Sequence, residues 1–513
     1  TAGARVDQAA GQLSFGSTAA GGGTRPSWRS SDHHTGVPEI TAPQFPSSLM
    51  LWENREVDTE TTQRHRVVVI GSGFGGLFAT KTLKRADVDV TMIAKTSHHL
   101  FQPLLYQVTT GILSEGEIAP PTREVLAKQK NAQVLLGEVD EIDLANRTVS
   151  HHVLGRRTTT PYDSLVVAAG AGQSYFGHDE FARYAPGMKS IDDALELRAR
   201  IFGAYEYAEV SANRGEEIDH LMTFVVVGAG PTGVEMAGQI AELAHKTLPT
   251  NFRAIDTRKS RVILIDGADQ VLPPFGEKLG AKTQQALEKL GVEVRLNTLV
   301  TDVDERGLTI RHTETGEQEY VDAVTKVWAA GVQASPLTKT LSEQTGAELD
   351  RAGRIAVNPD LTLPGHPEVF VVGDMIDLDG LPGVAQVAIQ GARYSATEIK
   401  RRLKGKPAQE PFKYFDKGSM ATISRFNAVA MVGKLRLTGM LAWLMWLVVH
   451  LVYMTGFKNQ VTALIRWAVT FIGNDRSERA VTMQQLFARQ AIERLKSGPA
   501  SLISDDDQRA SSS

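Results

Sequence analysis

Two glycine-rich turns carry the clearest chemical signal in this 513-residue chain. In the first, Gly71, Gly73 and Gly76 follow the β-branched run 67–70 and open an amphipathic stretch. With this spacing the first glycine allows a tight turn, the second lets a pyrophosphate approach the backbone, and the third permits close packing of helix on strand. The amino terminus of the helix presents N–H groups and partial positive charge to phosphates. The turn therefore predicts a dinucleotide site, and the alternative is a glycine-rich turn without a ligand.

The second turn repeats this spacing at Gly228, Gly230 and Gly233, again between a strand and a helix. The next strand ends in Asp266. A carboxylate at that position can accept hydrogen bonds from both ribose hydroxyls and would repel a 2′-phosphate, so NADH is favoured over NADPH. The alternative is that Asp266 only begins a turn with Gly267.

The corresponding position after the first turn lacks an acid. The segment 88–97 has Ala94 and Lys95 where the ribose-binding carboxylate is expected. This departure weakens the ribose contact at the first turn. It argues against NAD there more than against FAD, which has many other anchoring points.

Glu235 lies two residues beyond Gly233, in the first turn of the helix that follows the second glycine-rich turn. One role for this carboxylate is to complement the helix dipole. The other is to lie beside a nicotinamide ring. The residues alone leave both roles open.

Asp374 ends the run 366–375, shortly before the helical stretch 383–403. It could hydrogen-bond a ribityl chain, and the start of the helix could stabilise negative charge on a reduced flavin. A simple turn is the alternative for this aspartate. Two dinucleotide folds in one chain suit a hydride relay, in which NADH stacks on an isoalloxazine that stores the electrons.

The elements that must position these residues are short β-branched runs alternating with longer amphipathic stretches. Strands are expected at 67–70, 90–94, 165–168, 224–227, 262–265, 292–296 and 369–372. Their alternation with helical stretches implies βαβ units and parallel sheets. Because the two glycine-rich turns are separate, one sheet is expected to be nested inside the other. The predicted fold class is α/β, with two nested Rossmann-like dinucleotide-binding domains plus a C-terminal membrane-associating region.

The expected domains follow this division. They are a flexible tail at 1–64, an FAD-binding domain at 65–175 and 340–405, an NADH-binding domain at 176–339, a separate C-terminal region at 406–490, and a disordered tail at 491–513. No secretory signal is expected, because no continuous apolar stretch precedes Val67. A transit peptide stays an alternative, because Arg5, Arg25 and Arg29 are accompanied by few acids.

Composition excludes several classes of protein. The apolar fraction of 42% and charged fraction of 22% are ordinary for a folded protein. With 55 basic and 59 acidic side chains, no global field favours nucleic acid as a partner. The absence of cysteine removes disulfides, thiolate nucleophiles, iron–sulfur ligation and the commonest structural zinc sites. No metal site is expected at His98 and His99, which have no ligand-spaced partner.

The C-terminal region is strongly apolar, with runs at 439–457 and 461–472. Within the first run, Met440–Met454 is shorter than the roughly 20 residues that a membrane-spanning helix usually needs, although extending it to Phe457 comes close. Three tryptophans fit an interfacial belt and four basic residues could contact anionic headgroups, namely Trp443, Trp446, Trp467, Lys458, Arg466, Arg476 and Arg479. We expect two helices that lie on a membrane surface. A spanning helix and a buried dimer interface are the alternatives.

Six longer motifs resemble a single enzyme family. They are HLFQPLLYQV at 99–108, TPYDSLVVAAG at 160–170, KVWAAGV at 326–332, HPEVFVVGDM at 366–375, VAQVAIQGARY at 384–394 and YFDKGSMATISR at 414–425. Together with the paired turns, these motifs resemble type II NADH:quinone oxidoreductases, most closely the mycobacterial-like members, over about residues 65–490. Enzymes of this family consist of one kind of subunit, bind FAD without a covalent bond, reduce a membrane quinone and pump no protons.

The resemblance implies a set of cofactor contacts. For FAD these are Gly71, Gly73, Gly76, Lys95, Asp374, Ala385, Gln386 and Lys417, with Asp374 on the ribityl chain and Lys417 near the flavin. For NADH they are Gly228, Gly230, Gly233, Glu235, Asp266 and Gly331, with Glu235 near the nicotinamide.

Gln386 and Gln390 match the glutamine pair that the family places beside the quinone. They are four residues apart on one expected helix, so both amides can face the same pocket and hydrogen-bond a quinone carbonyl. The alternative is a solvated helix face, which the apolar neighbours Val384, Ala388 and Ile389 disfavour.

The expected reaction moves a hydride from NADH to FAD and then two electrons to a membrane quinone, either menaquinone or ubiquinone. The catalytic residues are expected to be Glu235, Gln386 and Gln390. The resemblance implies that region 406–490 serves membrane anchoring and dimerisation, and that the protein is a homodimer on the cytoplasmic face of the plasma membrane. Disulfide reductases, sulfide:quinone reductases and thiol peroxidases of similar architecture need cysteine, which this chain lacks. The alternative from another class is a membrane-bound NADH sensor similar to apoptosis-inducing factor.

Overall fold

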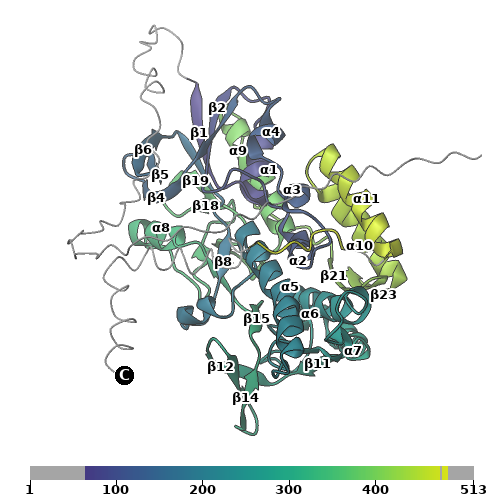
Figure 1. Cartoon of the computed structure of the whole chain (residues 1–513). Coiled ribbons are helices and arrows are strands. Elements are labelled where there is room, and N and C mark those ends of the chain that lie inside the picture. Colours follow the sequence, from purple (N-terminus) through teal and green to yellow (C-terminus); the bar gives the residue numbers. More distant parts are fainter. Residues whose placement is uncertain (1–63, 474–475, 483–513) are drawn as a thin grey trace, which may run out of the picture. The chain divides into compact units, whose positions relative to one another are not determined.

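The computed structural model describes residues 64–473 and 476–482 (Figure 1). Apart from Arg64, the tails predicted at 1–64 and 491–513 lie outside the described residues. Within the described range, two parallel sheets and a small C-terminal antiparallel sheet position the residues singled out above.

The first parallel sheet carries the first glycine-rich turn. Its strand order is β18-β19-β7-β1-β2-β3. The bounds are β1 His65–Ile70, β2 Val88–Ala94, β3 Ala132–Leu136, β7 Ser164–Val167, β18 Thr362–Leu363 and β19 His366–Val371. All neighbours are parallel except β18 and β19. Helices α1 (Phe74–Thr82) and α9 (Ala385–Arg402) pack against each other and share the apolar core of this sheet.

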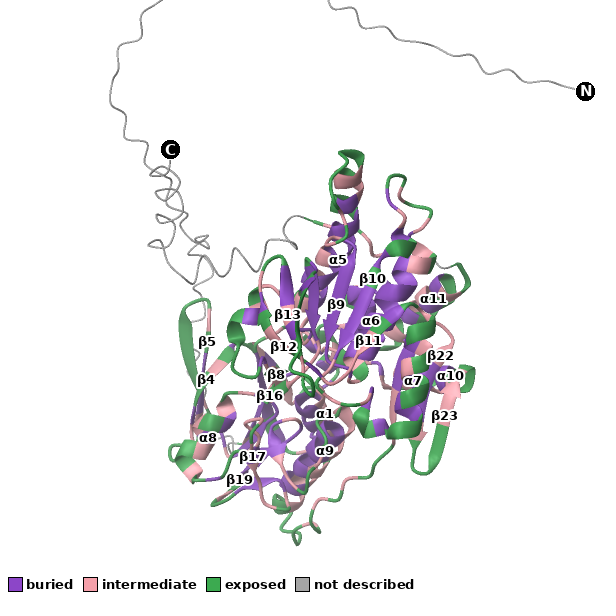
Figure 2. Cartoon of the chain, turned by 90° about the horizontal axis from the view of Figure 1, so that it is seen from below, coloured by how far each residue is buried: buried purple, intermediate pink, exposed green. Residues whose placement is uncertain are grey.

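The second parallel sheet carries the second glycine-rich turn and has the order β11-β10-β9-β15. The bounds are β9 Thr223–Val227, β10 Arg261–Ile265, β11 Val292–Arg295 and β15 Thr325–Trp328. Because side chains alternate along a strand, Val226 and Leu264 face α5 (Ile191–Asn213) and α6 (Pro231–Glu242), whereas Val225 and Ile263 face the other side. Burial on both faces explains the unbroken apolar runs, visible as purple strands in Figure 2.

An antiparallel sheet covers that other side of the second sheet. It consists of β12 Thr298–Val303, β13 Gly307–His312 and β14 Gln318–Asp322, in that order. Lys326 on β15 is fully buried, and its ammonium donates to the carbonyl oxygens of Asp304, Glu305 and Ala323. These bonds fasten β15 to the loop that joins β12 to β13.

The second sheet is inserted into the first, as the sequence predicts. The chain leaves the first sheet after β7, passes through β8 (Ala171–Gln173), builds the second sheet and returns through β16 (Val332–Ala334). Strands β8 and β16 pair antiparallel, so the outgoing and returning segments lie side by side. The nested α/β architecture is therefore confirmed, while the residue boundaries of the two domains stay a prediction.

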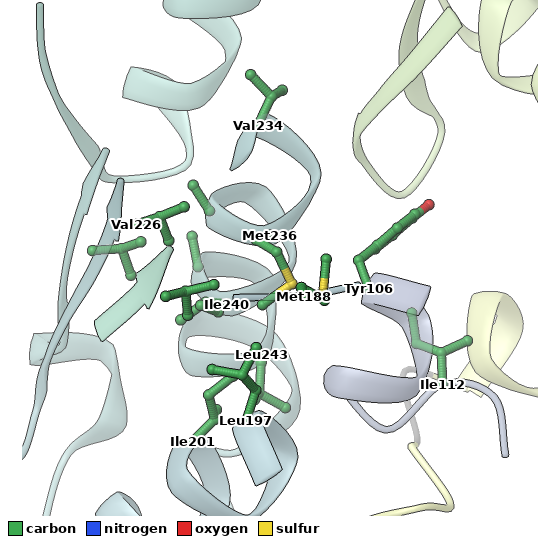
Figure 3. Packing of buried hydrophobic residues seen from close by; sticks show 14 of the residues in the cluster. Tyr106, Ile112, Met188, Leu197, Ile201, Val226, Val234, Met236, Ile240 and Leu243 are labelled. Atoms are coloured by element: carbon green, nitrogen blue, oxygen red, sulfur yellow. The ribbon is translucent and has the colours of Figure 1, made fainter. Parts of the chain in front are cut away.

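Helix α2 (Leu105–Thr109), from the HLFQPLLYQV motif, joins α5 and α6 in one apolar core (Figure 3). Tyr106 and Met188 lie beside Met236 of α6, while Leu197 of α5 packs nearby. Residues that precede the second sheet by more than a hundred positions thereby support its glycine-rich helix.

The remaining elements surround these layers. They are α3 Glu115–Ile118, α4 Thr122–Leu126, α7 Glu277–Lys289, α8 Leu337–Thr345, β4 Glu138–Asp143, β5 Thr148–Val153, β6 Arg156–Pro161, β17 Ile355–Ala356 and β20 Ile376–Asp377. Strands β4, β5 and β6 form an antiparallel sheet, and β17 pairs with β20 in parallel.

The C-terminal region begins with an antiparallel sheet that the sequence analysis did not predict. Strands β21 (Ser419–Ser424), β22 (Asn427–Val432) and β23 (Leu435–Gly439) pair in chain order. Helices α10 (Met440–Tyr453) and α11 (Phe457–Gly473) follow, which confirms that the two apolar runs are helical, while their place on a membrane surface stays a prediction. Among the described residues, no helix has the length and apolarity needed to cross a bilayer.

The expected tryptophan belt is wrong. Trp443, Trp446 and Trp467 are only 5%, 0% and 1% exposed. Trp443 packs edge-on against Phe426 and Phe471, and the rings of Trp446 and Trp467 are 5.6 Å apart. Aromatic rings gain most from burial, so they fill the space between the two helices and the sheet. The side chains that point outward are aliphatic instead.

One of the four expected headgroup contacts, that of Arg476, is also wrong, and Arg466 is paired within the protein. Arg466 forms ion pairs with Glu117 at 3.1 Å and with Glu478 at 2.7 Å. Arg476 is buried and donates to the Thr110 carbonyl oxygen at 2.8 Å. The buried guanidinium of Arg476 needs internal partners, whereas the side chain of Arg466 keeps 32% of its surface exposed. Both arginines tie α11 and the segment after it to the preceding core. Lys458 is exposed.

Helix α6 packs directly on β21, and we expect this contact to limit the stability of the protein. A Cβ at Gly238 would collide with the Ile423 carbonyl oxygen. Gly238→Ala should therefore lower the free energy of unfolding by about 1–3 kcal/mol, the usual cost of overpacking. Thermal unfolding of the flavin-loaded protein measures the effect.

The matched control is Gly203→Ala on α5, where no described atom lies within 4 Å of an added Cβ. This change should be neutral or stabilise by roughly 0.5–1 kcal/mol, because alanine favours helix. Equal melting temperatures for the two variants would contradict the close packing of α6 on β21.

Candidate functional site

The first glycine-rich turn has the geometry of a phosphate cradle. Gly71 has φ +100°, and its N–H donates to the Ile93 carbonyl oxygen at 2.8 Å. A Cβ at Gly76 would collide with the Gly71 carbonyl oxygen, so α1 rests directly on the turn. Around Gly73, no described atom lies within 4 Å of an added Cβ, and no described side chain caps α1. The N–H groups at the start of α1 are therefore open to a ligand such as the pyrophosphate of FAD.

The second turn repeats this geometry at the start of α6. Gly228 has φ +107° and donates to the Ile265 carbonyl oxygen at 2.7 Å. Space is again open at the middle glycine, Gly230, and within the described part of the chain no side chain caps α6. Because Ile93 and Ile265 accept equivalent bonds, the next residues, Ala94 and Asp266, occupy equivalent positions.

Asp266 is held on the second turn by its own backbone contacts. One carboxylate oxygen accepts from the N–H of Ala229, inside the glycine-rich turn, and the other from the N–H of Ala268 at 2.7 Å. An ionised carboxylate has further lone pairs, so the same oxygens can still accept ribose hydroxyls. At the first turn, Ala94 offers no such acceptor and Lys95 is exposed. The second turn therefore has a carboxylate that can bind ribose hydroxyls, and the first turn does not.

Next to the second turn lies a cavity of about 350 Å³ that sequence reasoning missed. Phe176, Trp328 and Leu299 are among the residues that line it. Phe176 has φ +56°, is 67% exposed and reaches over Gly331, where a Cβ would lie 2.8 Å from its ring. A strained, exposed aromatic ring at a cavity mouth is typical of a ligand contact. In the sequence, only the Phe-Gly pair at 176–177 signalled a turn there.

Glu235 is buried, with 8% of its surface exposed, and it faces β21 instead of solvent. Its carboxylate accepts from the Thr422 N–H at 3.3 Å and is also bonded by the Thr422 hydroxyl. Burial raises the pKa of Glu235 to about 8, and the Thr422 bonds partly offset that rise. The carboxyl group can therefore change charge near neutral pH. Thr422 lies in the YFDKGSMATISR motif but carried no signal of its own.

Asp374 lies shortly after β19, beside the start of α9. Burial raises the pKa of Asp374, and the nearby charges of Lys189 and Arg354 oppose this effect. A Cβ at Gly383 would lie 3.5 Å from its carboxylate, so the loop before α9 passes close by. The side chain is thus positioned at the edge of the first sheet where a ribityl chain could be bound.

Gln386, Lys417 and Tyr453 form one cluster from three separate elements. The Lys417 ammonium donates to the Tyr453 hydroxyl at 2.8 Å and lies 5.4 Å from the centre of its ring. The Gln386 side chain bonds to the same hydroxyl. Gln386 Oε1 is buried without a hydrogen-bond partner among the described residues. This acceptor fits a donor on a bound flavin or quinol.

Tyr453 was missed because it ends an apolar run, where an aromatic residue is ordinary. It is the last residue of α10 and so connects the C-terminal helices to α9. Lys417 is the main cause that lowers the pKa of Tyr453, through its hydrogen bond and its charge.

Gln390 is placed differently from Gln386. Its amide donates to the Phe415 carbonyl oxygen at 2.9 Å and accepts from the Phe415 N–H at 3.0 Å. Both polar atoms are therefore occupied by the loop that leads to Lys417. The two glutamines share a helix face, but only Gln386 keeps a free acceptor within the described structure.

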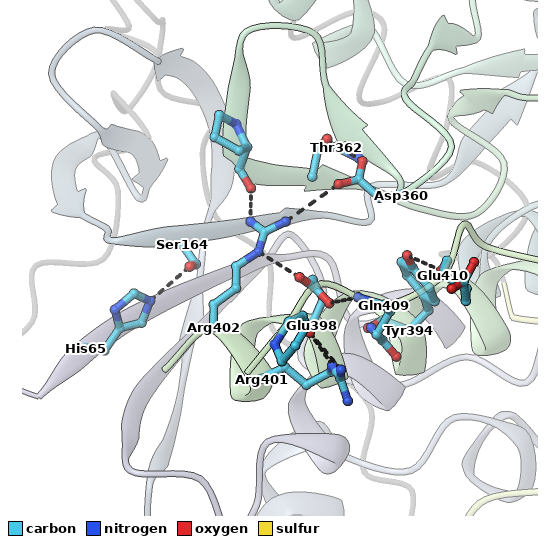
Figure 4. Close-up of polar contacts among 12 residues, drawn as sticks. His65, Ser164, Asp360, Thr362, Tyr394, Glu398, Arg401, Arg402, Gln409 and Glu410 are labelled. Carbon is cyan, nitrogen blue, oxygen red and sulfur yellow. Dashed lines mark hydrogen bonds and ion pairs between the residues drawn. The ribbon is translucent and has the colours of Figure 1, made fainter. Parts of the chain in front are cut away.

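Polar contacts at the end of α9 hold the same loop in place (Figure 4). Buried Glu398 accepts from Arg402 at 3.0 Å and from the Gln409 N–H at 3.0 Å. The Tyr394 hydroxyl donates to the Glu410 carbonyl oxygen at 2.8 Å. Helix α9 thus positions Lys417 through the loop as well as Gln386 directly.

Known proteins resemble this chain in sequence and in fold. Residues 65–392 match the family model described as pyridine nucleotide-disulphide oxidoreductase. Two Mycobacterium tuberculosis proteins are similar over most of the chain. The type II NADH:quinone oxidoreductase Ndh is 60% identical, over 86% of this chain and 95% of that protein. The type II NADH:quinone oxidoreductase NdhA is 61% identical, over 83% of this chain and 91% of that protein.

Among solved structures, NDH2 from Plasmodium falciparum in complex with NADH has a TM-score of 0.72 at 20% identity and covers 81% of this chain and 99% of its own. The sulfide:quinone oxidoreductase from Aquifex aeolicus has a TM-score of 0.61 at 17% identity and covers 80% and 95%. These likenesses show the fold.

Lys417→Met should raise the pKa of Tyr453. Lys417 stabilises the phenolate by charge and by a hydrogen bond, so its removal leaves the neutral phenol favoured to higher pH. Ultraviolet difference titration measures this pKa, with the same titration of a Tyr453→Phe variant subtracted in each background.

Lys413→Met is the matched control, because Lys413 is exposed in the same loop and does not affect the pKa of Tyr453. An unchanged Tyr453 titration in Lys417→Met would mean that the two groups do not interact in solution.

Proposed function

The chain belongs to the pyridine nucleotide-disulphide oxidoreductases and, within them, to the type II NADH:quinone oxidoreductases, and from this premise we propose how its residues divide the reaction. Electrons pass from NADH through FAD to a quinone. The observation that carries the division of roles is the pair of uncapped glycine-rich turns, of which only the second has a carboxylate at the ribose position.

The first turn fits FAD. Its open helix N-terminus accommodates a pyrophosphate, Asp374 fits the ribityl chain, and Lys417 with Gln386 fits the ring system from the α9 side. When bound, FAD accepts a hydride from NADH and passes two electrons to the quinone. The chain positions the reactants and supplies charge and hydrogen bonds.

The second turn fits NADH. Asp266 accepts hydrogen bonds from the ribose hydroxyls. Glu235 lies about one helical turn from the start of α6, where it is proposed to contact the nicotinamide. A nicotinamide that gives up a hydride becomes a cation, so an adjacent carboxylate stabilises the product side of the step. Because burial raises the pKa of Glu235 to about 8, this stabilisation grows as pH rises through that value.

The Gln386–Lys417–Tyr453 cluster is the site proposed for the quinone. Lys417 and Gln386 both donate to the phenol oxygen of Tyr453, which leaves the Tyr453 proton to be donated to a quinone oxygen. Gln390 supports this site indirectly, because it holds the backbone of Phe415 in the loop that carries Lys417.

Helices α10 and α11 supply the lipid-facing surface. Their outward residues are aliphatic or aromatic and strongly exposed, namely Leu441, Leu444, Val448, Val452, Phe457, Leu464, Ile465, Val469 and Ile472. A contiguous apolar face of this kind favours binding in the membrane interface, with both helices lying along the surface. We place the protein on the cytoplasmic face of the plasma membrane as a homodimer, the dimer contact being formed by the same C-terminal region. Val452 is adjacent to Tyr453, so a quinone leaving the lipid along α10 arrives at the proposed site.

The alternative of an NADH sensor similar to apoptosis-inducing factor receives no support from the relatives. The proteins that match at 60% and 61% identity are named as NADH:quinone oxidoreductases.

Gln386→Leu and Tyr453→Phe should separate the two half-reactions. Reduction of the flavin by NADH should change less than about two-fold, whereas its reoxidation by a short-chain quinone should slow about ten-fold, as expected for one lost hydrogen bond. Anaerobic rapid mixing measures each half-reaction from the flavin absorbance. Tyr207→Phe is the control, because Tyr207 lies on α5, outside the elements that form the proposed quinone site, and is 50% exposed. Equal slowing of both half-reactions in Gln386→Leu and Tyr453→Phe would contradict the quinone assignment.

Asp266→Ser should reduce the preference for NADH over NADPH about ten-fold, because it removes the ribose acceptor and the repulsion of a 2′-phosphate. Steady-state kcat/KM for both coenzymes measures the ratio. Asp269→Ser, an exposed acid in the same turn, should leave the ratio unchanged. If Asp266→Ser prefers NADH as strongly as the wild-type protein does, Asp266 only stabilises the turn and does not select the coenzyme.

A further inference from the structure

Five buried polar side chains form a continuous hydrogen-bonded chain from α11 to α6. The Trp467 indole N–H donates to Gln107 Oε1 at 2.7 Å, and Gln107 Nε2 donates to the Tyr106 hydroxyl at 3.1 Å. The Tyr106 hydroxyl is 2.8 Å from the Thr422 hydroxyl, which in turn bonds to Glu235. The chain therefore joins the C-terminal helix pair to the carboxylate proposed for the NADH site.

The indole of Trp467 determines the direction of every bond in this chain. An indole N–H can only donate, so Gln107 must present its oxygen to Trp467 and its NH₂ group to Tyr106. The Tyr106 oxygen then accepts from Gln107, which leaves the Tyr106 proton to be donated to Thr422. The Thr422 oxygen is thereby an acceptor, so its own proton is directed to Glu235.

The opposite direction leaves a buried proton without an acceptor. If Glu235 donated to Thr422, the Thr422 proton would turn to Tyr106, whose oxygen would then accept two bonds. The Tyr106 proton would have no acceptor in this chain, a state that costs free energy in a buried site. Burial and the neighbouring Glu235 carboxyl also raise the pKa of Tyr106, so its hydroxyl keeps its proton.

We propose that Trp467 is a positioning residue for Glu235: its indole directs the chain through Gln107, Tyr106 and Thr422 so that a hydroxyl is donated to the carboxylate. The effect is to favour the ionised form of Glu235 inside a buried site. This inference rests on the proposed function, in which that carboxylate lies beside the nicotinamide.

Three further ionisable groups lie in or beside the chain. Tyr106 faces it from α2, and the guanidinium of Arg476, after α11, donates to Gln239 Oε1 at 3.0 Å, one turn farther along α6. Glu242, on the same helix, interacts with Arg476 through charge. None of these three groups is among the causes of the Glu235 pKa shift, which are burial and the two Thr422 bonds.

Trp467→Phe should raise the pKa of Glu235 by about one unit, the equivalent of a weakened hydrogen bond to a charged group. Without the indole donor, the Gln107 amide can rotate and accept from Tyr106, so that Thr422 turns toward Tyr106. Glu235 then keeps only the Thr422 backbone N–H. The infrared C=O band of protonated Glu235, identified by its loss in Glu235→Gln, reports this pKa directly in the flavin-loaded protein without turnover.

The pH dependence of flavin reduction by NADH supplies the second readout. In Trp467→Phe, the pH midpoint of flavin reduction should rise together with the Glu235 pKa measured by infrared spectroscopy.

Trp446→Phe is the matched control. Trp446 is equally buried on α10 and contacts Trp467, but its indole N–H has no hydrogen-bond partner within residues 64–473 and 476–482. Both variants lose similar packing, so both should lower the melting temperature by a similar amount. Only Trp467→Phe should move the Glu235 pKa, and equal shifts in the two variants would overturn the proposal.

Thr422→Val tests the same chain at its other end. It keeps the backbone N–H and removes the hydroxyl that reaches Glu235, so the Glu235 pKa should rise by at least the shift seen in Trp467→Phe. In the Thr422→Val background, Trp467→Phe should add nothing further. Additive shifts would mean that Trp467 acts by another route and would also overturn the proposal.

The outcomes for Glu235→Gln separate this inference from the proposed function. If Glu235→Gln leaves the pH dependence of flavin reduction unchanged, the role of Glu235 at the NADH site is wrong. If Glu235→Gln abolishes that dependence but Trp467→Phe does not change the Glu235 pKa measured by infrared spectroscopy, Glu235 still acts at the NADH site and only the positioning role of Trp467 is wrong.

Discussion

Helix α6 approaches the backbone of β21 so closely that this contact determines where the C-terminal region lies. Gly238 lets the helix rest on the backbone of Ile423, so that the adjacent Thr422 reaches Glu235. The same contact fixes the C-terminal sheet, and with it α10 and α11, against the sheet that carries the second glycine-rich turn. A residue larger than glycine at 238 would separate the helix from β21. The two apolar helices are therefore packed, through this sheet, against the domain that carries the proposed NADH site.

Insertion of one dinucleotide fold into another explains why the two halves of the reaction meet. Strands β8 and β16 lie side by side where the chain leaves and re-enters the first sheet. This antiparallel pair connects the two sheets and so holds the two glycine-rich turns relative to each other. Each turn is followed by a helix whose N-terminus is open to a ligand. The two turns differ at the ribose position, where the second has Asp266 and the first has Ala94. On the other side, α9 brings Gln386 to Tyr453 at the end of α10. One flavin can thus serve a water-soluble donor and a lipid-soluble acceptor.

Local patterns made the central strands, α9 and both turns predictable, because buried parallel strands and glycine spacing are properties of adjacent residues. The resemblance to a family supplied the roles that we propose for Glu235 and Gln386. Contacts between distant segments were not predictable. The sheet at 419–439 has short strands with little alternation, and Tyr453 ends an apolar run where nothing marks it as polar. The tryptophans of α10 and α11 were assigned to the lipid surface because an apolar helix has two sides, and sequence does not say which one the rest of the chain covers.

The central claim is that one flavin carries electrons from NADH to quinone in the same protein. Its most direct test is anaerobic double mixing of the wild-type protein in detergent, first with one equivalent of NADH and then with a short-chain quinone. The flavin absorbance should bleach and then return, and the rate of its return should be at least the rate of steady-state turnover. A flavin that bleaches with NADH and stays bleached in the presence of quinone would contradict the account and indicate a sensor instead.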